Sequence, residues 1–381
     1  MKQKVLQIGS YILVAALASA LTLAGMGGTG ETSKLSQLQS LIEERYIEGA
    51  DPTVLEDAAA DAMVAATGDR WSYYIPASEY ETYQENMANA YVGVGITILS
   101  SEDVEGFRIM SVTPGGPAEE AGVQKDDVLI GVDGQDVRQS DANQVRNLVR
   151  GEEGTDVVLT VLREEAELEL TVQRRHMETP VATYTMLEDR MGLVTIENFD
   201  SRCSEETIAA IEALREQGAQ KLIFDVRNNP GGFAEELVKV LDYLLPEGDL
   251  FRTERYDGYE DVDVSDENFL DMPMAVLVNG DSYSAAEFFA AALQEYEAAI
   301  VVGEHTSGKG HFQTTYQLSD GSAVALSIGR YYTPNGVCLE GVGIEPDVPV
   351  TVDEDTAMEI YFDSLPWDED PQIQAALDAL K

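Results

Sequence analysis

Ser284 stands where a buried strand changes into a helix. The apolar run Met274–Val278 predicts a strand, Asn279–Asp281 predicts a turn, and Phe288–Gln294 has a helical composition. A serine hydroxyl in such a turn lies beside the free N–H groups of the first helical turn. An acyl-transfer nucleophile needs both this exposure and these donors, which stabilise its oxyanion. Serine is also a common helix cap, so this position alone leaves both roles open.

Lys309 could supply the base that such a serine needs. It follows Ser284 by twenty-five positions and lies between two glycines, which let the backbone bend tightly and approach a neighbour closely. Burial lowers the pKa of a lysine, and Ser–Lys pairs are an established variant of the serine triad. His305 and His311 flank the lysine and suggest a Ser–His pair as the alternative, but we expect both to be loop or strand residues.

These residues carry a family resemblance. The string Asn279–Glu287, the Ser284–Lys309 spacing and Gln313 four positions further on resemble the C-terminal processing (tail-specific) peptidase family. The resemblance implies that Ser284 is the nucleophile, that Lys309 is the general base, and that Gln313 orients the lysine. The family often has a serine where this chain has Ala286, and that difference leaves the proposed dyad complete.

The turn Asn228–Gly232 is a second motif of the same family. It reads Asn-Asn-Pro-Gly-Gly and follows the apolar strand Leu222–Val226. The resemblance implies that a backbone amide of Gly231 or Gly232 joins the N–H of Ala285 in an oxyanion hole. The same letters also suit a plain turn from strand to helix, and that reading does not exclude the role.

Residues 91–174 resemble a PDZ domain. Its opening contains closely spaced glycines, which let backbone N–H groups converge on a peptide carboxylate while the peptide adds a strand to a sheet edge. The expected peptide-binding residues are Val92, Gly93, Val94 and Gly95. Just ahead of this domain, the aromatic string Trp71–Tyr74 resembles another family signature, and we interpret it as packing.

The composition excludes several classes of function. The 381 residues include 24 Lys and Arg against 70 Asp and Glu, a formal net charge of −46. This charge argues against binding to nucleic acid and to anionic membrane surfaces. Cys203 and Cys338, with three histidines, show no metal-ligand spacing, so we expect neither a metal nor a cofactor. A disulfide between the two cysteines remains open.

The amino terminus predicts a membrane anchor. Lys2 and Lys4 precede the apolar run Val5–Met26, whose length suits a membrane span with its basic end in the cytoplasm. Ala18–Ala20 has the A-x-A pattern of a cleaved signal peptide, which is the alternative. We expect an uncleaved anchor at the cell membrane and an extracytoplasmic body, which would be secreted if the segment were cleaved.

Strands and helices alternate through the second half of the chain. This order predicts an α/β catalytic core with a mostly parallel sheet, and the resemblance adds a crotonase or Clp-protease-like architecture. The acidic stretch Tyr256–Asp271 is expected to be a solvated loop, and Ile373–Leu380 the last helix. The expected regions are an anchor or signal with a spacer (1–30), a helical region (31–89), the PDZ domain (90–175), the catalytic domain (176–352) and a tail (353–381).

We therefore expect a serine endopeptidase that recognises protein C-termini through its PDZ domain and cleaves extracytoplasmic proteins. Its expected partners are proteins or peptides with free C-termini, and a homo-oligomer remains open. The alternative from another class is a catalytically inactive PDZ adaptor that tethers partner tails. The joint presence of Ser284, Lys309 and Gln313 argues against it.

Overall fold

The computed structural model describes residues 33–100, 104–362 and 364–381. The chain divides into two compact units at Gly68 and Asp69. In the first unit, helices α2 (Lys34–Arg45) and α3 (Pro52–Ala65) form the helical region that the sequence predicts. The break between them arises because Asp51 caps α3 through the N–H of Thr53 and Pro52 occupies the first turn.

The catalytic part of the second unit is built on a six-stranded sheet of order β10-β11-β12-β15-β16-β19. Its strands are β10 (Ala182–Met186), β11 (Met191–Ile196), β12 (Lys221–Asp225), β15 (Met274–Val278), β16 (Ala299–Gly303) and β19 (Val348–Pro349). The pair β10–β11 is antiparallel, and the other neighbouring pairs are parallel. The helices that cover it are α7 (Cys203–Glu216), α8 (Ala234–Leu244), α9 (Ala285–Glu295) and α11 (Pro371–Ala379).

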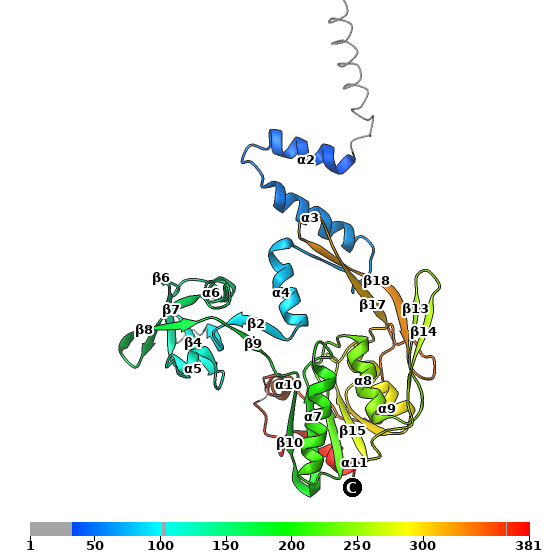
Figure 1. Cartoon of the computed structure of the whole chain (residues 1–381). Coiled ribbons are helices and arrows are strands. Elements are labelled where there is room, and N and C mark those ends of the chain that lie inside the picture. Colours follow the sequence, from blue (N-terminus) through cyan, green and yellow to red (C-terminus); the bar gives the residue numbers. More distant parts are fainter. Residues whose placement is uncertain (1–32, 101–103, 363) are drawn as a thin grey trace, which may run out of the picture. The chain divides into compact units, whose positions relative to one another are not determined.

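Helices cover both faces of this sheet. Successive side chains of a strand point to opposite faces, so each strand contributes to both cores. Leu222 and Phe224 of β12 belong to the core beneath α7, α8 and α9, which lie side by side in Figure 1. Ile223 belongs to the opposite core, which α11 covers with Ile373. The parallel strands therefore deliver their following turns to one edge of the sheet, where α/β proteins commonly place their sites.

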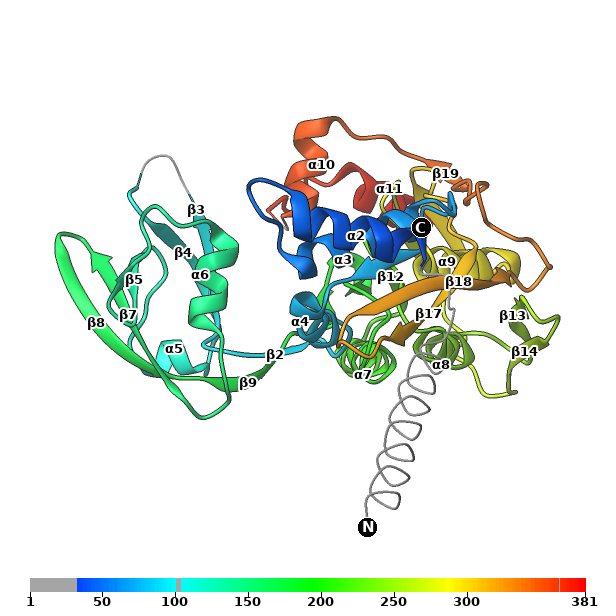
Figure 2. The same ribbon diagram turned by 90° about the horizontal axis from the view of Figure 1, so that it is seen from above.

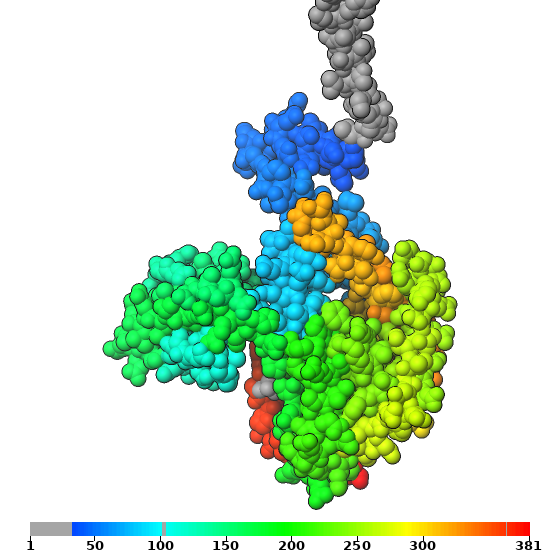
Figure 3. All heavy atoms as spheres, in the orientation of Figure 1, coloured from blue at the N-terminus to red at the C-terminus, as the bar shows by residue number. Residues whose placement is uncertain are grey.

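A second, antiparallel sheet carries the lysine-bearing segment. It contains β1 (Tyr73–Ile75), β13 (Gly248–Arg255), β14 (Glu260–Ser265), β17 (His311–Gln317) and β18 (Ala323–Tyr332). The expected solvated loop in Tyr256–Asp271 is partly wrong, because β14 lies within it and pairs with β13. Val262 and Val264 alternate with Asp261 and Asp263, but both valines are exposed, so the alternation marks no buried face. The hairpin lies at the surface in Figure 3.

The PDZ region has a core and a sheet of its own. Its elements are β3 (Ile96–Ser100), β4 (Phe107–Val112), α5 (Pro117–Glu120), β5 (Val128–Val132), β6 (Gln135–Asp136), α6 (Ala142–Val149), β7 (Asp156–Arg163) and β8 (Ala166–Gln173). Figure 2 shows α6 beside β3. The two strands of a separate ribbon, β2 (Ala90–Gly93) and β9 (Arg175–Glu178), flank it in sequence.

Three further helices complete the second unit. They are α4 (Ala77–Met87), the short 3₁₀ helix Glu188–Arg190 and α10 (Glu354–Tyr361). The expected last helix corresponds to α11. Within the described ranges, no helix is long and apolar enough to span a bilayer, and the predicted anchor Val5–Met26 lies outside those ranges.

Candidate active site

Ser284 occupies the strained turn between β15 and α9. Its φ of 58° and ψ of −125° lie in a region that L-residues with a side chain rarely adopt. A hydrogen bond joins this turn to the end of β12, because the Ser282 hydroxyl donates to the carbonyl of Val226 at 2.7 Å. Ser284 is 7% exposed and is followed at once by the first helical residue, Ala285. This is the strand–turn–helix setting that the sequence predicts for a nucleophile.

The glycine turn after β12 packs directly against the nucleophile. A Cβ added to Gly231 would lie 2.7 Å from the Ser284 Cβ and 2.8 Å from the Ala285 nitrogen, and its φ is +87°. Any side chain there would therefore displace the serine. The N–H of Gly231 donates to Asn229 Oδ1 at 2.8 Å, so it is already used. Of the two expected oxyanion donors, the structure therefore favours Gly232 over Gly231.

Glu287 joins the nucleophile turn to the lysine loop. Its fully buried carboxylate accepts two hydrogen bonds on each oxygen. Oε2 accepts from the N–H of Ser284 at 2.9 Å and from the N–H of Lys309 at 2.8 Å. Oε1 accepts from the N–H of Gly308 at 2.7 Å and from the Thr306 hydroxyl at 2.6 Å. One carboxylate thus sets the spacing between the two catalytic segments.

The Lys309 side chain enters an aromatic niche. Its Nζ lies 5.0 Å from the ring centroid of Trp71 and 5.6 Å from that of Tyr283. Burial lowers the pKa of the Lys309 ammonium, and this effect outweighs the attraction of Glu340, Asp69 and Glu287, which raises it. A lysine in this state can accept a proton.

One cavity of about 320 Å³ brings the expected residues together. Ser284, Lys309, Gln313, Gly231 and Gly232 all line it. Aromatic and apolar side chains complete its walls, and these are Trp71, Tyr73, Tyr83, Met87, Phe233, Tyr283, Phe312 and Tyr331. The aromatic string near Trp71 packs as interpreted, since Trp71 stacks on Tyr283 and Tyr73 lies edge-on to Tyr83. Trp71 and Tyr73 also line this cavity.

Gln313 is held in place by its amide group. Its Nε2 donates to the carbonyl of His311 at 3.1 Å and to the Ser327 hydroxyl at 3.0 Å. These bonds fix the amide plane within the cavity wall. Gln313 was expected to orient Lys309, and the described structure places the two residues in one cavity without a hydrogen bond between them.

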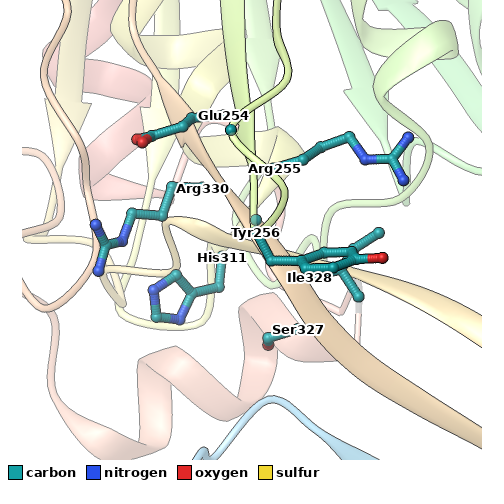
Figure 4. A pocket seen from close by; sticks show the side chains of 9 residues that line it. Glu254, Arg255, Tyr256, His311, Ser327, Ile328 and Arg330 are labelled. Carbon is teal, nitrogen blue, oxygen red and sulfur yellow. The ribbon is translucent and has the colours of Figure 1, made fainter.

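The two histidines near Lys309 lie elsewhere. His305 is exposed and faces Glu345 at 3.6 Å. His311 faces Glu340 at 3.6 Å and lines a separate hollow between β13 and β18. Figure 4 shows His311 and Arg330 on one side of this hollow and Tyr256 on the other. Neither histidine lines the cavity that contains Ser284, as expected for loop and strand residues.

The PDZ region contains a second groove of about 320 Å³ between β3 and α6. Gly93, Val94 and Gly95 line it, as expected for peptide-binding residues. Val92, which pairs with His176 in the β2–β9 ribbon, does not line it. The α6 side contributes two cationic residues, which are Arg146 and Arg150.

Cys203 and Cys338 are both free thiols, so the disulfide left open by the sequence is not formed. Cys203 is buried, and burial raises the pKa of its thiol to about 12. The thiol therefore remains protonated in the interior and takes no part in nucleophilic chemistry.

Comparison with known proteins agrees with this arrangement. Residues 190–350 match the model of peptidase family S41, and residues 108–163 match a PDZ domain. A probable CtpA-like serine protease of Staphylococcus aureus (strain N315) is 31% identical over 336 residues, which cover 86% of this chain and 67% of the relative. The chain belongs to peptidase family S41 and is a serine peptidase with a PDZ domain.

Two solved structures extend the comparison. The photosystem II D1 C-terminal processing protease is 30% identical, and the match covers 78% of this chain and 82% of that chain with a TM-score of 0.48. An S41 protease from Bacteroides fragilis NCTC 9343 is 16% identical, and the match covers 84% of this chain and 89% of that one with a TM-score of 0.52. The second likeness shows that the fold is shared.

Glu287 is the functional residue that the sequence analysis missed. Its place three positions after Ser284 suggests only the last residue of a helix-capping box, which the bond to the Ser284 N–H satisfies. Its three other hydrogen-bond donors come from the segment Thr306–Lys309. Contacts between residues so far apart in the sequence leave no local sequence pattern.

Proposed function

We propose that Ser284 and Lys309 form the catalytic dyad of a serine endopeptidase. The neutral Lys309 amine takes the proton of the Ser284 hydroxyl while Oγ bonds to the scissile carbonyl carbon. The resulting ammonium then gives the proton to the leaving peptide amine as the C–N bond breaks. In the second half, Lys309 takes a proton from water while the water oxygen bonds to the acyl carbon. The ammonium then returns that proton to Ser284 Oγ as the acyl C–Oγ bond breaks, which restores the hydroxyl and the neutral amine.

The backbone N–H groups of Gly232 and Ala285 are the proposed oxyanion donors. Among the described residues, neither group has a hydrogen-bond partner. Ala285 directly follows Ser284, and the turn that contains Gly232 packs against Ser284 through Gly231. They can therefore receive the charge that develops on the carbonyl oxygen. The Oε1 of Gln313 has no hydrogen bond among the described residues, and Gln313 is proposed to orient the ammonium once it forms.

One observation carries this proposal. A strained serine and a lysine with a lowered pKa line the same cavity, and one carboxylate, that of Glu287, holds both their backbones. We expect Ser284→Ala and Lys309→Ala each to abolish cleavage of an unstructured protein, with folding intact by circular dichroism. The double variant should be no worse than either single variant, because the two residues act as one unit. Normal turnover by either single variant would rule out the dyad.

We further propose that the PDZ groove captures the free C-terminus of the substrate. The groove joins closely spaced glycines to Arg146, and this combination suits a peptide carboxylate, while Arg150 is already paired with Glu85 at 2.5 Å. The test is peptide binding to the full chain carrying Ser284→Ala, with free and amidated forms of one sequence. Amidation should weaken binding, and equal affinities would refute carboxylate capture.

The remaining expectations stay proposals. We propose that Val5–Met26 anchors the protein in the cell membrane, that the body acts on extracytoplasmic proteins, and that the core has the crotonase or Clp-protease-like architecture. Support for the anchor comes from the length of the apolar run and its basic flank. Fractionation of cells expressing the full chain tests it, because a cleaved signal would release a shorter soluble product.

A further inference from the structure

Asp200 is a buried carboxyl without a partner. It lies in the loop between β11 and α7, is 5% exposed, and lines the cavity that contains Ser284. Among the described residues, its Oδ1 is the buried side-chain oxygen for which no hydrogen-bond donor exists. Buried polar groups are nearly always paired, so an unpaired carboxyl in a catalytic cavity points to a partner that arrives with the substrate.

The loop backbone holds Asp200 next to the oxyanion turn. A Cβ added to Gly232 would lie 2.6 Å from the Asp200 nitrogen, and one added to Gly231 would lie 2.7 Å from the Ser284 Cβ. The glycine turn therefore contacts Asp200 through Gly232 and Ser284 through Gly231. The N–H of Asp200 donates to Asn198 Oδ1 at 2.9 Å, so the backbone position is fixed without any bond from the side chain.

The cavity around Asp200 suits a long cationic side chain. Asp200 is the one carboxyl among the residues that line this cavity in the described structure. The aromatic walls can cover an aliphatic stem and attract a cation, while the carboxylate can pair with its head. The lining cation Arg70 is already engaged, since it donates to the carbonyls of Ser307 and Gly308 and lies 4.1 Å from the Trp71 ring centroid.

We propose that Asp200 is a specificity-determining residue, which selects substrates with a lysine or arginine side chain beside the scissile bond. This inference rests on the proposed peptidase site. The cationic head pairs with the Asp200 carboxylate, while the peptide carbonyl next to it lies in the oxyanion hole.

This pairing makes the selectivity depend on pH. Burial raises the pKa of Asp200 to about 7, so the carboxylate becomes the main form only above that pH. The neighbouring titratable groups are Tyr73, Tyr283 and Cys203, and burial raises the pKa of each, so they stay uncharged below pH 8. The cationic lining residues are Arg70 and Lys309.

On the α7 side, the charged groups near Asp200 have hydrogen-bond partners other than Asp200. Arg202 bonds to Glu206 at 2.9 Å, and Glu236 accepts from the N–H and the hydroxyl of Ser204. Between pH 6 and 8, Asp200 is thus the cavity group whose ionisation controls a preference for cations. The preference should rise with pH.

The experiment is a competition within one tube. Two peptides are identical except that one carries arginine and the other its neutral near-isostere citrulline beside the cleaved bond, in sets with this residue on either side. Mass spectrometry gives the ratio of the two kcat/KM values, in which the general-base contribution of Lys309 cancels. Any effect of the Lys309 charge on arginine remains in Asp200→Asn, so the comparison with that variant isolates Asp200. The proteins compared are the parent, Asp200→Asn and Asp281→Asn, which removes a nearby exposed carboxylate that does not line the cavity.

We expect the parent to prefer arginine by about ten- to a hundredfold at pH 8, as for one charge-assisted hydrogen bond. The preference should shrink toward pH 6. Asp200→Asn should bring the ratio close to one, and Asp281→Asn should keep the parental ratio. A parental ratio near one at every pH, or one that survives in Asp200→Asn, would overturn the inference.

Other outcomes are separated by two further readings. If Asp200→Asn fails to fold, the pH dependence of the parental ratio decides alone, and a ratio above one that stays flat from pH 6 to 8 counts against Asp200. If the parent cleaves neither peptide set while Ser284→Ala behaves identically, the proposed peptidase function fails and the inference falls with it.

Discussion

Replacing Glu287 by glutamine should disconnect the two catalytic segments. The substitution keeps the shape of the side chain but turns one of the two carboxylate oxygens into an NH₂ group. At the Oε2 position that group would face two backbone N–H donors, and at the Oε1 position it would face the Gly308 N–H and the Thr306 hydroxyl, which can accept from it. One or two charge-assisted hydrogen bonds are lost, each contributing about 1.5–3 kcal/mol, so we expect a cost of roughly 1.5–6 kcal/mol in the free energy of unfolding.

The same change should reduce catalysis in the molecules that remain folded. Because the donors include the backbone N–H groups of Ser284 and Lys309, their loss allows the nucleophile and the base to move apart. A displacement of about 1 Å costs on the order of a hundredfold in rate. We therefore expect kcat to fall by about that factor or more.

The assay pairs urea unfolding, followed by tryptophan fluorescence, with peptide turnover corrected for the folded fraction. Glu297→Gln is the matched control, because it makes the same chemical change at an exposed residue just beyond the end of α9. The control should behave like the parent. If Glu287→Gln lost less than about 1 kcal/mol and turned over normally, Glu287 would not position the dyad.

Three further predictions follow from single contacts. Gly231→Ala should lower kcat/KM at least about a hundredfold with the circular dichroism spectrum unchanged, because the new Cβ would lie 2.7 Å from the Ser284 Cβ; parental kcat/KM would contradict this. Asp370→Ala should destabilise the catalytic domain by about 3–5 kcal/mol in urea unfolding, since it leaves the buried Arg227 without one of its two carboxylate partners; a change below 1 kcal/mol would count against that pairing. Asp200→Asn should raise the melting temperature relative to the parent more at pH 8 than at pH 5. The folded-state pKa of Asp200 is raised to about 7, so stability is lost as pH rises from the unfolded value of about 3.9 through 7, and an equal gain at both pH values would refute this ionisation.

The strand, turn and helix around Ser284 could be predicted because each is a local pattern. The five apolar residues of β15 gave the bounds of the strand correctly. The turn residues after it placed Ser284 before the helix, which begins at Ala285, three residues earlier than the helical composition predicts. Periodicity alone could not pair Ser284 with Lys309. The spacing of the two residues in the sequence, which matches the family motif, predicted that they act together. Their meeting in one cavity is a property of the sheet edge, where successive parallel strands end.

Other features left no signal in the sequence. The choice of Gly232 over Gly231 depends on one side-chain bond from Asn229, which no turn rule specifies. The unpaired state of Asp200 depends on which groups fail to reach it, and this is visible only once the loop is packed. The strand β14 was missed because its short alternation of Asp and Val lies in an acidic stretch and most of its side chains are exposed, although it pairs with β13.

The most direct test of the central claim is the rate at which a fluorophosphonate modifies Ser284, measured by intact mass from pH 6 to 10. The parent should gain one adduct on Ser284, at a rate that rises with pH. The midpoint of this rise should lie below about 10.4, the pKa of a free lysine, because burial lowers the pKa of Lys309. Lys309→Ala should react at least about a hundredfold more slowly, while His305→Gln and His311→Gln keep the parental profile. The account would be contradicted by rapid labelling of Lys309→Ala, or by a midpoint near about 6.5 that disappears in either histidine variant.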